Sequence, residues 1–168
     1  DENGNIKTFN STDGNFEFRT ARGHNYVITA DKQNHTSTRA VINTLNKKRT
    51  DKDDTVKVVI YVDEVNMDER FRLDNILYAY DDAKLLPESA ATLERLIEFL
   101  KDNPSLDVEI HSHTDSKGDA NYNKNLSQRR AQSVVNYLVE NGIGANRLKA
   151  VGYGKEQPIA ENTINGKD

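Results

Sequence analysis

HTD at residues 113–115 and NKNLSQRRA at residues 123–131 are the two segments that decide the fold of the second half of this chain. Before the first segment, apolar and polar side chains alternate over residues 106–111, which is the pattern of a half-buried strand. The second segment predicts an amphipathic helix that opens at Leu126-Ser127 with an arginine in its first turn. A strand, a polar loop and a helix in this order predict an α/β arrangement, in which ligands bind outside the carboxyl ends of the strands.

Strand and helix signals alternate throughout the second half of the chain. Short strands are expected at residues 76–80 and 148–153, and Pro87 precedes a first helix that ends at Asn103-Pro104. The second helix is closed by Asn141-Gly142. The expected buried stripes are Leu93, Leu96, Ile97 and Leu100 on the first helix, and Ala131, Val134, Val135 and Leu138 on the second. This rhythm predicts helices packed on a sheet, with parallel pairing wherever a helix crosses over.

Residues 1–64 have the sequence pattern of a β region. Strands are expected at residues 15–19, 26–30 and 55–62, and residues 37–43 add a further candidate. The side chains expected on the inner face of a small sandwich are Phe16, Phe18, Tyr26 and Ile28. Charged residues replace the β pattern over residues 65–72, which we interpret as a linker. The chain also begins inside what reads as a turn, so we expect it to be a fragment of a longer protein.

The composition narrows the possible functions. The net charge is −4, and the basic cluster at residues 47–49 is followed directly by acids, so we interpret it as a solvated loop and expect no nucleic-acid partner. Cysteine is absent, which excludes a disulfide framework and a cysteine nucleophile. No apolar run approaches the ~18 residues of a membrane-spanning helix. Membrane association is therefore expected only through the rest of the protein or through partner proteins.

Asp115 and Arg130 are the candidate binding residues. A carboxylate at the end of a strand accepts hydrogen bonds from an ammonium group, and the planar guanidinium of an arginine binds a carboxylate in bidentate fashion. Unpaired N–H groups at the start of the helix would add a favourable field for a negative group. The crevice therefore suits a small zwitterion. The alternative is a salt bridge between Asp115 and Arg130, which would close the cleft and leave a protein-interaction scaffold.

A metal site is a second alternative. His111, His113 and Asp115 follow an H-x-H-x-D pattern, which would place three potential ligands on one face of a strand and suggests a metal-dependent hydrolase. The two remaining histidines, His24 and His35, belong to the β region. No nucleophile–base pair is discernible. We therefore favour a non-enzymatic binding module without a cofactor or metal over this alternative.

A resemblance to a known family rests on three runs: HTDSKGDANYNKNLSQRRAQSVVNYLVENGI (113–143), GYGKEQP (152–158) and YAYDDAKL (78–85). Arg147-Leu148 lies between the first two and also matches. Together they resemble the OmpA C-terminal-like peptidoglycan-binding domain. The resemblance implies an α+β fold, in which a small β-sandwich precedes a βαβαβ domain at residues 73–168 with helices packed on a mixed sheet. The family continues into an Asn-Arg-Arg-containing final strand, which we expect to be absent from this chain.

The resemblance also implies the ligand and the compartment. Asp115 and Arg130 would bind the diaminopimelate of the peptidoglycan stem peptide, and Asp81 matches a further contact position. The remaining pocket residues would be Thr114, Asn123, Leu126 and Tyr80. The protein would anchor a larger envelope protein to the cell wall from the periplasmic side of the outer membrane.

A second resemblance concerns the β region. The pattern Asp-Gly-Asn-Phe-Glu-Phe at residues 13–18, a turn at Gly23 and Tyr-Val-Ile-Thr-Ala at residues 26–30 are similar to part of the carboxypeptidase regulatory-like β-sandwich. This sandwich followed by the second domain resembles the C-terminal half of modular envelope proteins of Bacteroidota, including the peptidoglycan tether of the type IX secretion machinery.

Overall fold

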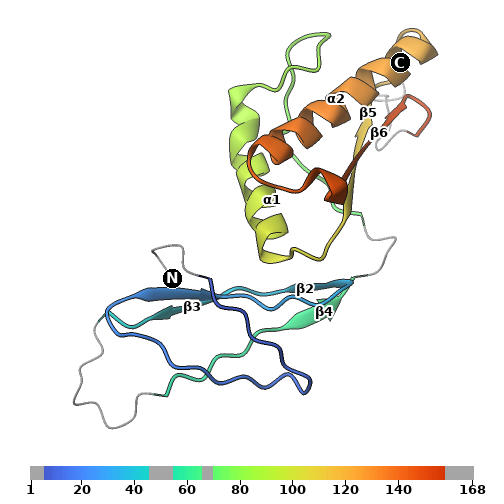
Figure 1. Ribbon diagram of the computed structural model, residues 1–168. Helices are drawn as coiled ribbons and strands as arrows, with labels where there is room; N and C mark the ends of the chain where they lie inside the picture. The colour runs from blue at the N-terminus through green and yellow to red at the C-terminus, as the bar shows by residue number, and fades with distance from the viewer. Residues whose placement is uncertain (1–5, 46–54, 66–69, 158–168) are drawn as a thin grey trace, which may run out of the picture.

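The computed structural model describes residues 6–45, 55–65 and 70–157, which form a β region and a mixed α/β domain (Figure 1). Three sequence predictions lie outside the described residues: the solvated loop at residues 47–49, the middle of the expected linker at residues 66–69, and the end of the chain at residues 158–168. The predicted fold class, helices packed on small sheets, is confirmed.

The β region contains two small antiparallel sheets. Its strands are β1 (Asn25–Ile28), β2 (His35–Ser37), β3 (Ala40–Asn43) and β4 (Val62–Glu64). Strand β1 pairs with β3, and Tyr26 lies opposite Ile42. Strand β2 pairs with β4, and Thr36 lies opposite Asp63. The expected strands at 26–30 and 37–43 are thus present with shifted bounds, and the second is divided between β2 and β3.

Two of the strands predicted in this region are wrong. Residues 15–19 form no strand, because no partner strand pairs with them, although the rings of Phe16 and Phe18 stack with centroids 6.1 Å apart. Residues 55–61 are not in a strand either, since only the end of this segment reaches a partner, where Thr38 and Tyr61 exchange hydrogen bonds. Among residues 6–45 and 55–65, Thr44 alone is buried.

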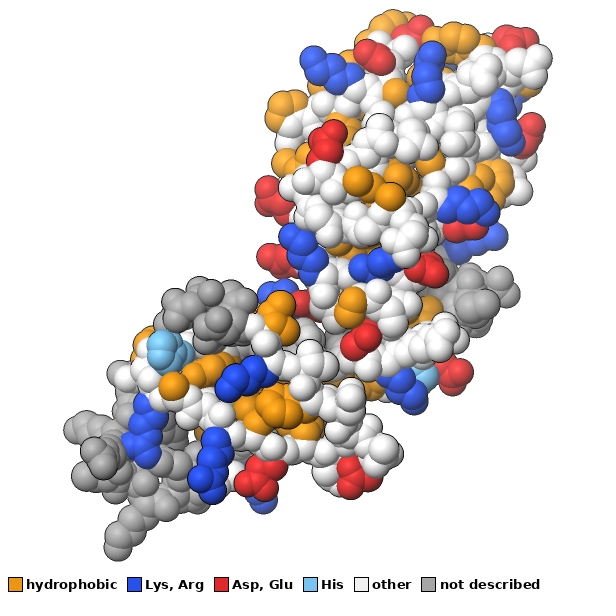
Figure 2. All heavy atoms as spheres, in the orientation of Figure 1, with side chains coloured by type: hydrophobic (Ala, Val, Ile, Leu, Met, Phe, Trp, Pro, Cys, Tyr) orange, Lys and Arg blue, Asp and Glu red, His pale blue; other side chains and the backbone are white. Residues whose placement is uncertain are grey.

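The expected inner face is therefore not a closed core. Phe16 is 42% exposed, and the other three members, Phe18, Tyr26 and Ile28, are half-buried. Hydrophobic side chains of the β region are visible on the surface in the lower part of Figure 2, next to charged side chains of both signs. The two sheets are small and share little apolar surface.

The α/β domain supplies the core of the molecule. Its elements are η1 (Pro87–Ser89), α1 (Ala90–Asp102), β5 (Val108–His113), α2 (Ala120–Glu140), η2 (Ala145–Arg147) and β6 (Leu148–Gly154). Strands β5 and β6 are parallel, with Ile110 opposite Ala150, as the helical crossover between them predicts. The predicted helix stripes are confirmed: Leu93, Ile97, Leu100, Ala131, Val134, Val135 and Leu138 are buried in one cluster, and Leu96 packs against it.

The start of α2 differs from the prediction. The helix begins at Ala120 rather than at Leu126, because the side chain of Asp119 caps it by accepting a hydrogen bond from the backbone N–H of Tyr122 at 2.9 Å. The polar residues of the first turns resemble a loop in composition. Arg130 consequently lies about three turns inside the helix, not in its first turn.

The predicted strand at residues 76–80 is also not formed. Only Tyr78 pairs, in an isolated antiparallel bridge with Leu85. Asp81 has φ 53°, in the left-handed region, which turns the chain back sharply so that the backbone N–H of Ala79 donates to the carbonyl of Lys84 at 2.9 Å. The segment is therefore a tight hairpin that cannot extend a ladder.

Helix α2 approaches β6 very closely at Gly152. A Cβ atom on Gly152 would lie 2.5 Å from the Cα atom of Gln128 and 2.6 Å from the hydroxyl of Ser127, so only glycine fits. The hydroxyl of Ser127, which is fully buried, donates to the carbonyl of Lys124 and accepts from the N–H of Gly154 at 2.8 Å. Backbone proximity and a buried hydrogen bond together set the position of α2 on the sheet.

We predict that Gly152→Ala destabilises the fold by about 3 kcal/mol or more, because the added methyl group clashes with backbone that cannot move aside. The control is Gly142→Ala. Gly142 has φ 92° but nothing within 4 Å of its Cβ position, so only backbone strain of about 1–2 kcal/mol is expected there. Urea unfolding of both variants measures the difference. Equal losses would contradict the packing argument.

The C-terminal end of α1 is held by Arg147. Its guanidinium donates to the carbonyls of Leu100, Asn103 and Leu106, with the shortest bond, from Nη2 to Asn103, at 2.7 Å. Carbonyls at a helix end lack partners within the helix, and a cation there also suits the helix dipole. Arg147 therefore fixes the turn that connects α1 to β5.

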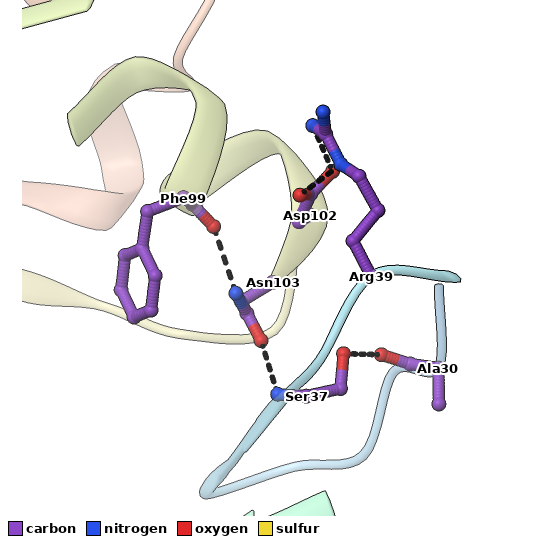
Figure 3. A network of polar contacts seen from close by, with 6 residues as sticks. All are labelled: Ala30, Ser37, Arg39, Phe99, Asp102 and Asn103. Carbon is purple, nitrogen blue, oxygen red and sulfur yellow. Dashed lines mark hydrogen bonds and ion pairs between the residues drawn. The ribbon is translucent and has the colours of Figure 1, made fainter. Parts of the chain in front are cut away.

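The β region contacts the α/β domain at this same end of α1 (Figure 3). Asn103, which is 2% exposed, accepts a hydrogen bond from the N–H of Ser37 and donates to the carbonyl of Phe99, both at 2.8 Å. Arg39 forms a bidentate pair with Asp102, and Ser105 donates to the carbonyl of Lys32 at 3.1 Å. The two parts are thus joined by directed polar contacts.

We predict that Asn103→Ala lowers the free energy of unfolding by about 1–3 kcal/mol, because it leaves the N–H of Ser37 without its acceptor. Arg39→Ala is the comparison. Its ion pair is partly exposed, with side chains 39% and 21% accessible, so a loss of at most about 1 kcal/mol is expected. Chemical denaturation of the two variants tests the order. A larger loss for Arg39→Ala would show that the ion pair, not Asn103, carries the contact.

Candidate ligand-binding site

Arg130 is held against the hairpin at residues 78–82. Its Nε donates to the backbone carbonyl of Asp82 at 2.9 Å, and its Cζ lies 5.0 Å from the ring centroid of Tyr78. The hydroxyl of Tyr78 donates in turn to the backbone carbonyl of Arg130 at 3.3 Å. Burial raises the pKa of Tyr78 to about 12, although the positive charge of Arg130 acts in the opposite direction. The phenol is therefore neutral at ordinary pH.

Asp81 is joined to the first turn of α2. The hydroxyl of Tyr122 donates to Oδ1 of Asp81 at 2.7 Å, and this bond is the main cause of the raised pKa of Tyr122. The preceding residue, Tyr80, is fully exposed and does not belong to the core. The hairpin thus presents an exposed carboxylate and an exposed aromatic ring beside the helix.

Thr114 and Asp115 follow the end of β5. The N–H of Thr114 donates to the carbonyl of Gly154 at 2.9 Å, which continues the pairing of β5 with β6. The carboxylate of Asp115 is exposed and accepts from the N–H of Lys117 at 3.3 Å. The loop is held by Asn123, whose side-chain amide donates to the carbonyl of Lys117 at 2.7 Å.

Asn123 and Leu126, two of the predicted pocket residues, are each 5% exposed. Asn123 holds the loop after β5 through its bond to Lys117, and Leu126 is a buried residue of α2. These two side chains are therefore closed to solvent, whereas Asp81, Tyr80 and Asp115 are exposed.

Asp115 and Arg130 do not pair with each other. Within the described part of the chain, the carboxylate of Asp115 bonds only to the backbone N–H of Lys117, and the terminal nitrogens of Arg130 bond to no acceptor. The closed salt bridge considered from the sequence is therefore not formed. Because Arg130 lies inside α2, the expected help from unpaired N–H groups at the helix start does not apply to it either.

Three residues of this arrangement were not predicted from the sequence: Tyr78 beneath Arg130, the backbone of Asp82, and Tyr122 beside Asp81. Each contact joins segments about forty or fifty positions apart, so no local pattern reveals it. The one signal in the sequence is that Tyr78 and Tyr80 come shortly before Asp81 and Asp82, which suggests an aromatic ring close to charged residues.

Residues 77–168 match the model of the OmpA family, and this segment is more than half of the chain. The chain belongs to the OmpA family. Outer membrane porin F of Pseudomonas fluorescens is 40% identical over 93 residues, which are 55% of this chain and 28% of that protein. The peptidoglycan-associated lipoprotein of Rhizobium meliloti is 36% identical over 87 residues, or 52% of this chain and 49% of that protein.

A solved structure is similar to this chain over part of its length. The crystal structure of the peptidoglycan-associated lipoprotein from Burkholderia pseudomallei is 29% identical, with a TM-score of 0.50, and the match covers 55% of this chain and 78% of that one. The match spans about a quarter of the length of porin F and about half of the length of the Rhizobium meliloti lipoprotein. Among the described residues, no helix has the length and apolar character needed to cross a membrane.

The two histidines of β5 contact neighbouring side chains of the OmpA-family domain. Nε2 of His111 lies 2.9 Å from a carboxylate oxygen of Glu109, and the ring of His113 stacks on Tyr153 with centroids 5.1 Å apart. Asp115 lies beyond the end of β5. No group of three or more potential ligands comes close enough to hold a metal ion in the ranges that the structure describes, so the three-ligand arrangement suggested by the sequence is not formed.

His113 is a partly buried histidine whose protonation differs between the folded and the unfolded chain. Burial lowers the pKa of its imidazole below the usual 6.5, and the charges of His111 and Arg70 act in the same direction, whereas the backbone of Gln157 acts against it. The unfolded chain therefore binds a proton at higher pH than the folded chain. We predict that stability falls as the pH decreases below about 6.5, and that His113→Phe reduces this fall. Urea unfolding at about pH 7.5 and about pH 5.5 tests it; an unchanged acid loss in the variant would contradict it.

Proposed function

We propose that this chain binds peptidoglycan non-covalently through the diaminopimelate of the stem peptide, and that it anchors an envelope protein to the cell wall. The observation that carries the proposal is that Asp115 and Arg130, two opposite charges of the OmpA-family domain, are not paired with each other. Charges that already satisfied one another would offer little to a ligand.

The proposed ligand supplies what each group lacks. The side-chain terminus of diaminopimelate carries both an ammonium and a carboxylate. Asp115 would accept hydrogen bonds from the ammonium, and the free terminal nitrogens of Arg130 would bind the carboxylate. Asp81 and Thr114 would contribute further polar contacts. The aliphatic part of the ligand would meet Tyr80, while Asn123 and Leu126 support the site from below.

The names of the relatives support this proposal and its location. Two of them are named peptidoglycan-associated lipoproteins, and another is an outer membrane porin. These are names of envelope proteins, not of enzymes, which supports a binding role without a cofactor. We propose that the chain works in the periplasm, beside the outer membrane, and that any membrane attachment comes from the rest of the protein or from partners.

We propose the same domain division that the sequence suggests. Residues 1–64 form a module, residues 65–72 a linker and residues 73–168 the binding domain. The resemblance of residues 13–30 to the carboxypeptidase regulatory-like sandwich supports a modular envelope protein of the Bacteroidota type, of which the peptidoglycan tether of the type IX secretion machinery is one.

We predict that Asp115→Ala and Arg130→Ala each weaken binding to purified peptidoglycan by about 1.5–3 kcal/mol, or roughly ten- to a hundredfold, because each removes a charge-assisted contact. Matched controls are Asp107→Ala, directly before β5, and Lys101→Ala, in the last turn of α1. Both residues are exposed, and each control removes the same charge as the corresponding site variant. Co-sedimentation with the wall measures the effect. If both site variants sediment like the parent, the site is wrong.

The same variants test the identity of the ligand. Two capped peptides are compared, one with diaminopimelate and one with lysine at the same position. In both, the α-amino and α-carboxyl groups form amide bonds, so the peptides differ only at the end of this side chain. Calorimetry should show at least about tenfold tighter binding of the diaminopimelate peptide, since lysine leaves Arg130 without a carboxylate. Arg130→Ala should remove most of this preference. Equal affinities of the parent for the two peptides would exclude the diaminopimelate assignment.

A further inference from the structure

The guanidinium of Arg130 is oriented by one short segment of the chain. The carbonyl of Asp82 accepts from Nε at 2.9 Å, and the ring of Tyr78 lies 5.0 Å from Cζ. The hydroxyl of Tyr78 also donates to the backbone carbonyl of Arg130 at 3.3 Å, which ties the ring to the helix that carries the arginine. An arginine side chain is otherwise among the most flexible in a protein.

Tyr78 is itself a fixed surface. Its backbone pairs with Leu85 in the isolated bridge, and the N–H of Leu86 donates to the carbonyl of Leu77 at 2.9 Å. The ring packs against the hydrophobic core cluster of the domain. Burial of the phenol is also the cause of its high pKa of about 12. The ring therefore has little freedom to move, and a guanidinium in contact with its face is confined with it.

These contacts leave one edge of the guanidinium free. Arginine has five N–H donors in a rigid plane, and in this structure only the Nε donor is used. The two terminal nitrogens, whose donors fit a carboxylate in bidentate fashion, have no acceptor in residues 6–45, 55–65 or 70–157. A side chain that is already ordered loses less entropy when it binds a ligand than a free one does.

We propose that Tyr78 is a positioning residue for ligand binding, which holds the Arg130 guanidinium through its ring face so that the two terminal nitrogens are presented to an incoming carboxylate. The inference rests on the proposed binding of a diaminopimelate-type group at Arg130. It adds a residue that does not touch the ligand and that acts only on the carboxylate half of the site. Asp115 and the ammonium half are independent of it.

Two substitutions separate the ring from the hydroxyl. Tyr78→Phe keeps the aromatic face and loses the bond to the Arg130 carbonyl, whereas Tyr78→Leu loses both. We expect Tyr78→Phe to bind the capped diaminopimelate peptide within about twofold of the parent. Tyr78→Leu should bind it about three- to tenfold more weakly, the combined effect of a lost cation–π contact and a less ordered arginine. Binding of the capped lysine peptide should be unchanged in both variants.

A double-mutant cycle distinguishes positioning from a general loss of stability. In an Arg130→Ala background, Tyr78→Leu should have no further effect on the diaminopimelate peptide, because the group it positions is gone. An equal loss in both backgrounds would overturn the proposal. So would a Tyr78→Leu protein that binds like the parent, or a Tyr78→Phe protein that binds as weakly as Tyr78→Leu.

A measurement on the parent covers the case in which Tyr78→Leu does not fold. The side-chain protons of Arg130 should show ring-current shifts in the NMR spectrum of the parent and of Tyr78→Phe, because the ring lies over the guanidinium in both. Unshifted signals would overturn the proposal. Failure of the parent itself to bind either peptide would instead reject the proposed function, whereas loss of binding in Arg130→Ala alone, with Tyr78→Leu unaffected, would reject only the role of Tyr78.

Discussion

The close approach of α2 to β6 at Gly152 is the contact on which the rest of the α/β domain depends. Helix α2 contributes much of the buried core, and it also carries Tyr122, Asn123 and Arg130, which reach the two loops of the site. The buried hydroxyl of Ser127 holds the helix to the N–H of Gly154. A shift of the helix by the width of a methyl group would therefore disturb packing and binding geometry together, because both are built on one rigid element.

The parts of the fold that were predictable are those in which periodicity and burial agree. The apolar stripes of α1 and α2 and the alternation of β5 reflect a single buried face, so the pattern in the sequence is also the pattern in space. The start of α2 was missed because its first turns are polar and are stabilised by the Asp119 cap instead of by an apolar stripe. In the β region, apolar alternation at residues 15–19 and 55–61 predicted strands that the structure does not contain, since no long partner strand covers them.

The charged residues of the candidate site could be named from the sequence, whereas the residues that contact and orient them could not. Asp115 and Arg130 stand out by residue type, by position and by resemblance to a family. What prepares them is tertiary: a tyrosine under the guanidinium, a second tyrosine on Asp81 and an amide across the loop after β5. The absence of an Asp115–Arg130 pair in the described chain also depends on these neighbours. The carbonyl of Asp82 and the ring of Tyr78 hold the guanidinium in an orientation that does not require a carboxylate partner.

Asn103 and Arg147 lie at one end of β5, and Asp115 lies just beyond the other. Six residues of strand separate these ends, which corresponds to about 20 Å at ~3.3 Å per residue. Figure 1 places the β region on the side of the domain away from the start of α2. The strand thus separates its two ends by a set length, and the hydrogen bonds of Asn103 join the β region to one of these ends. Whatever the β region carries would therefore lie about the length of β5 away from any ligand that binds near Asp115.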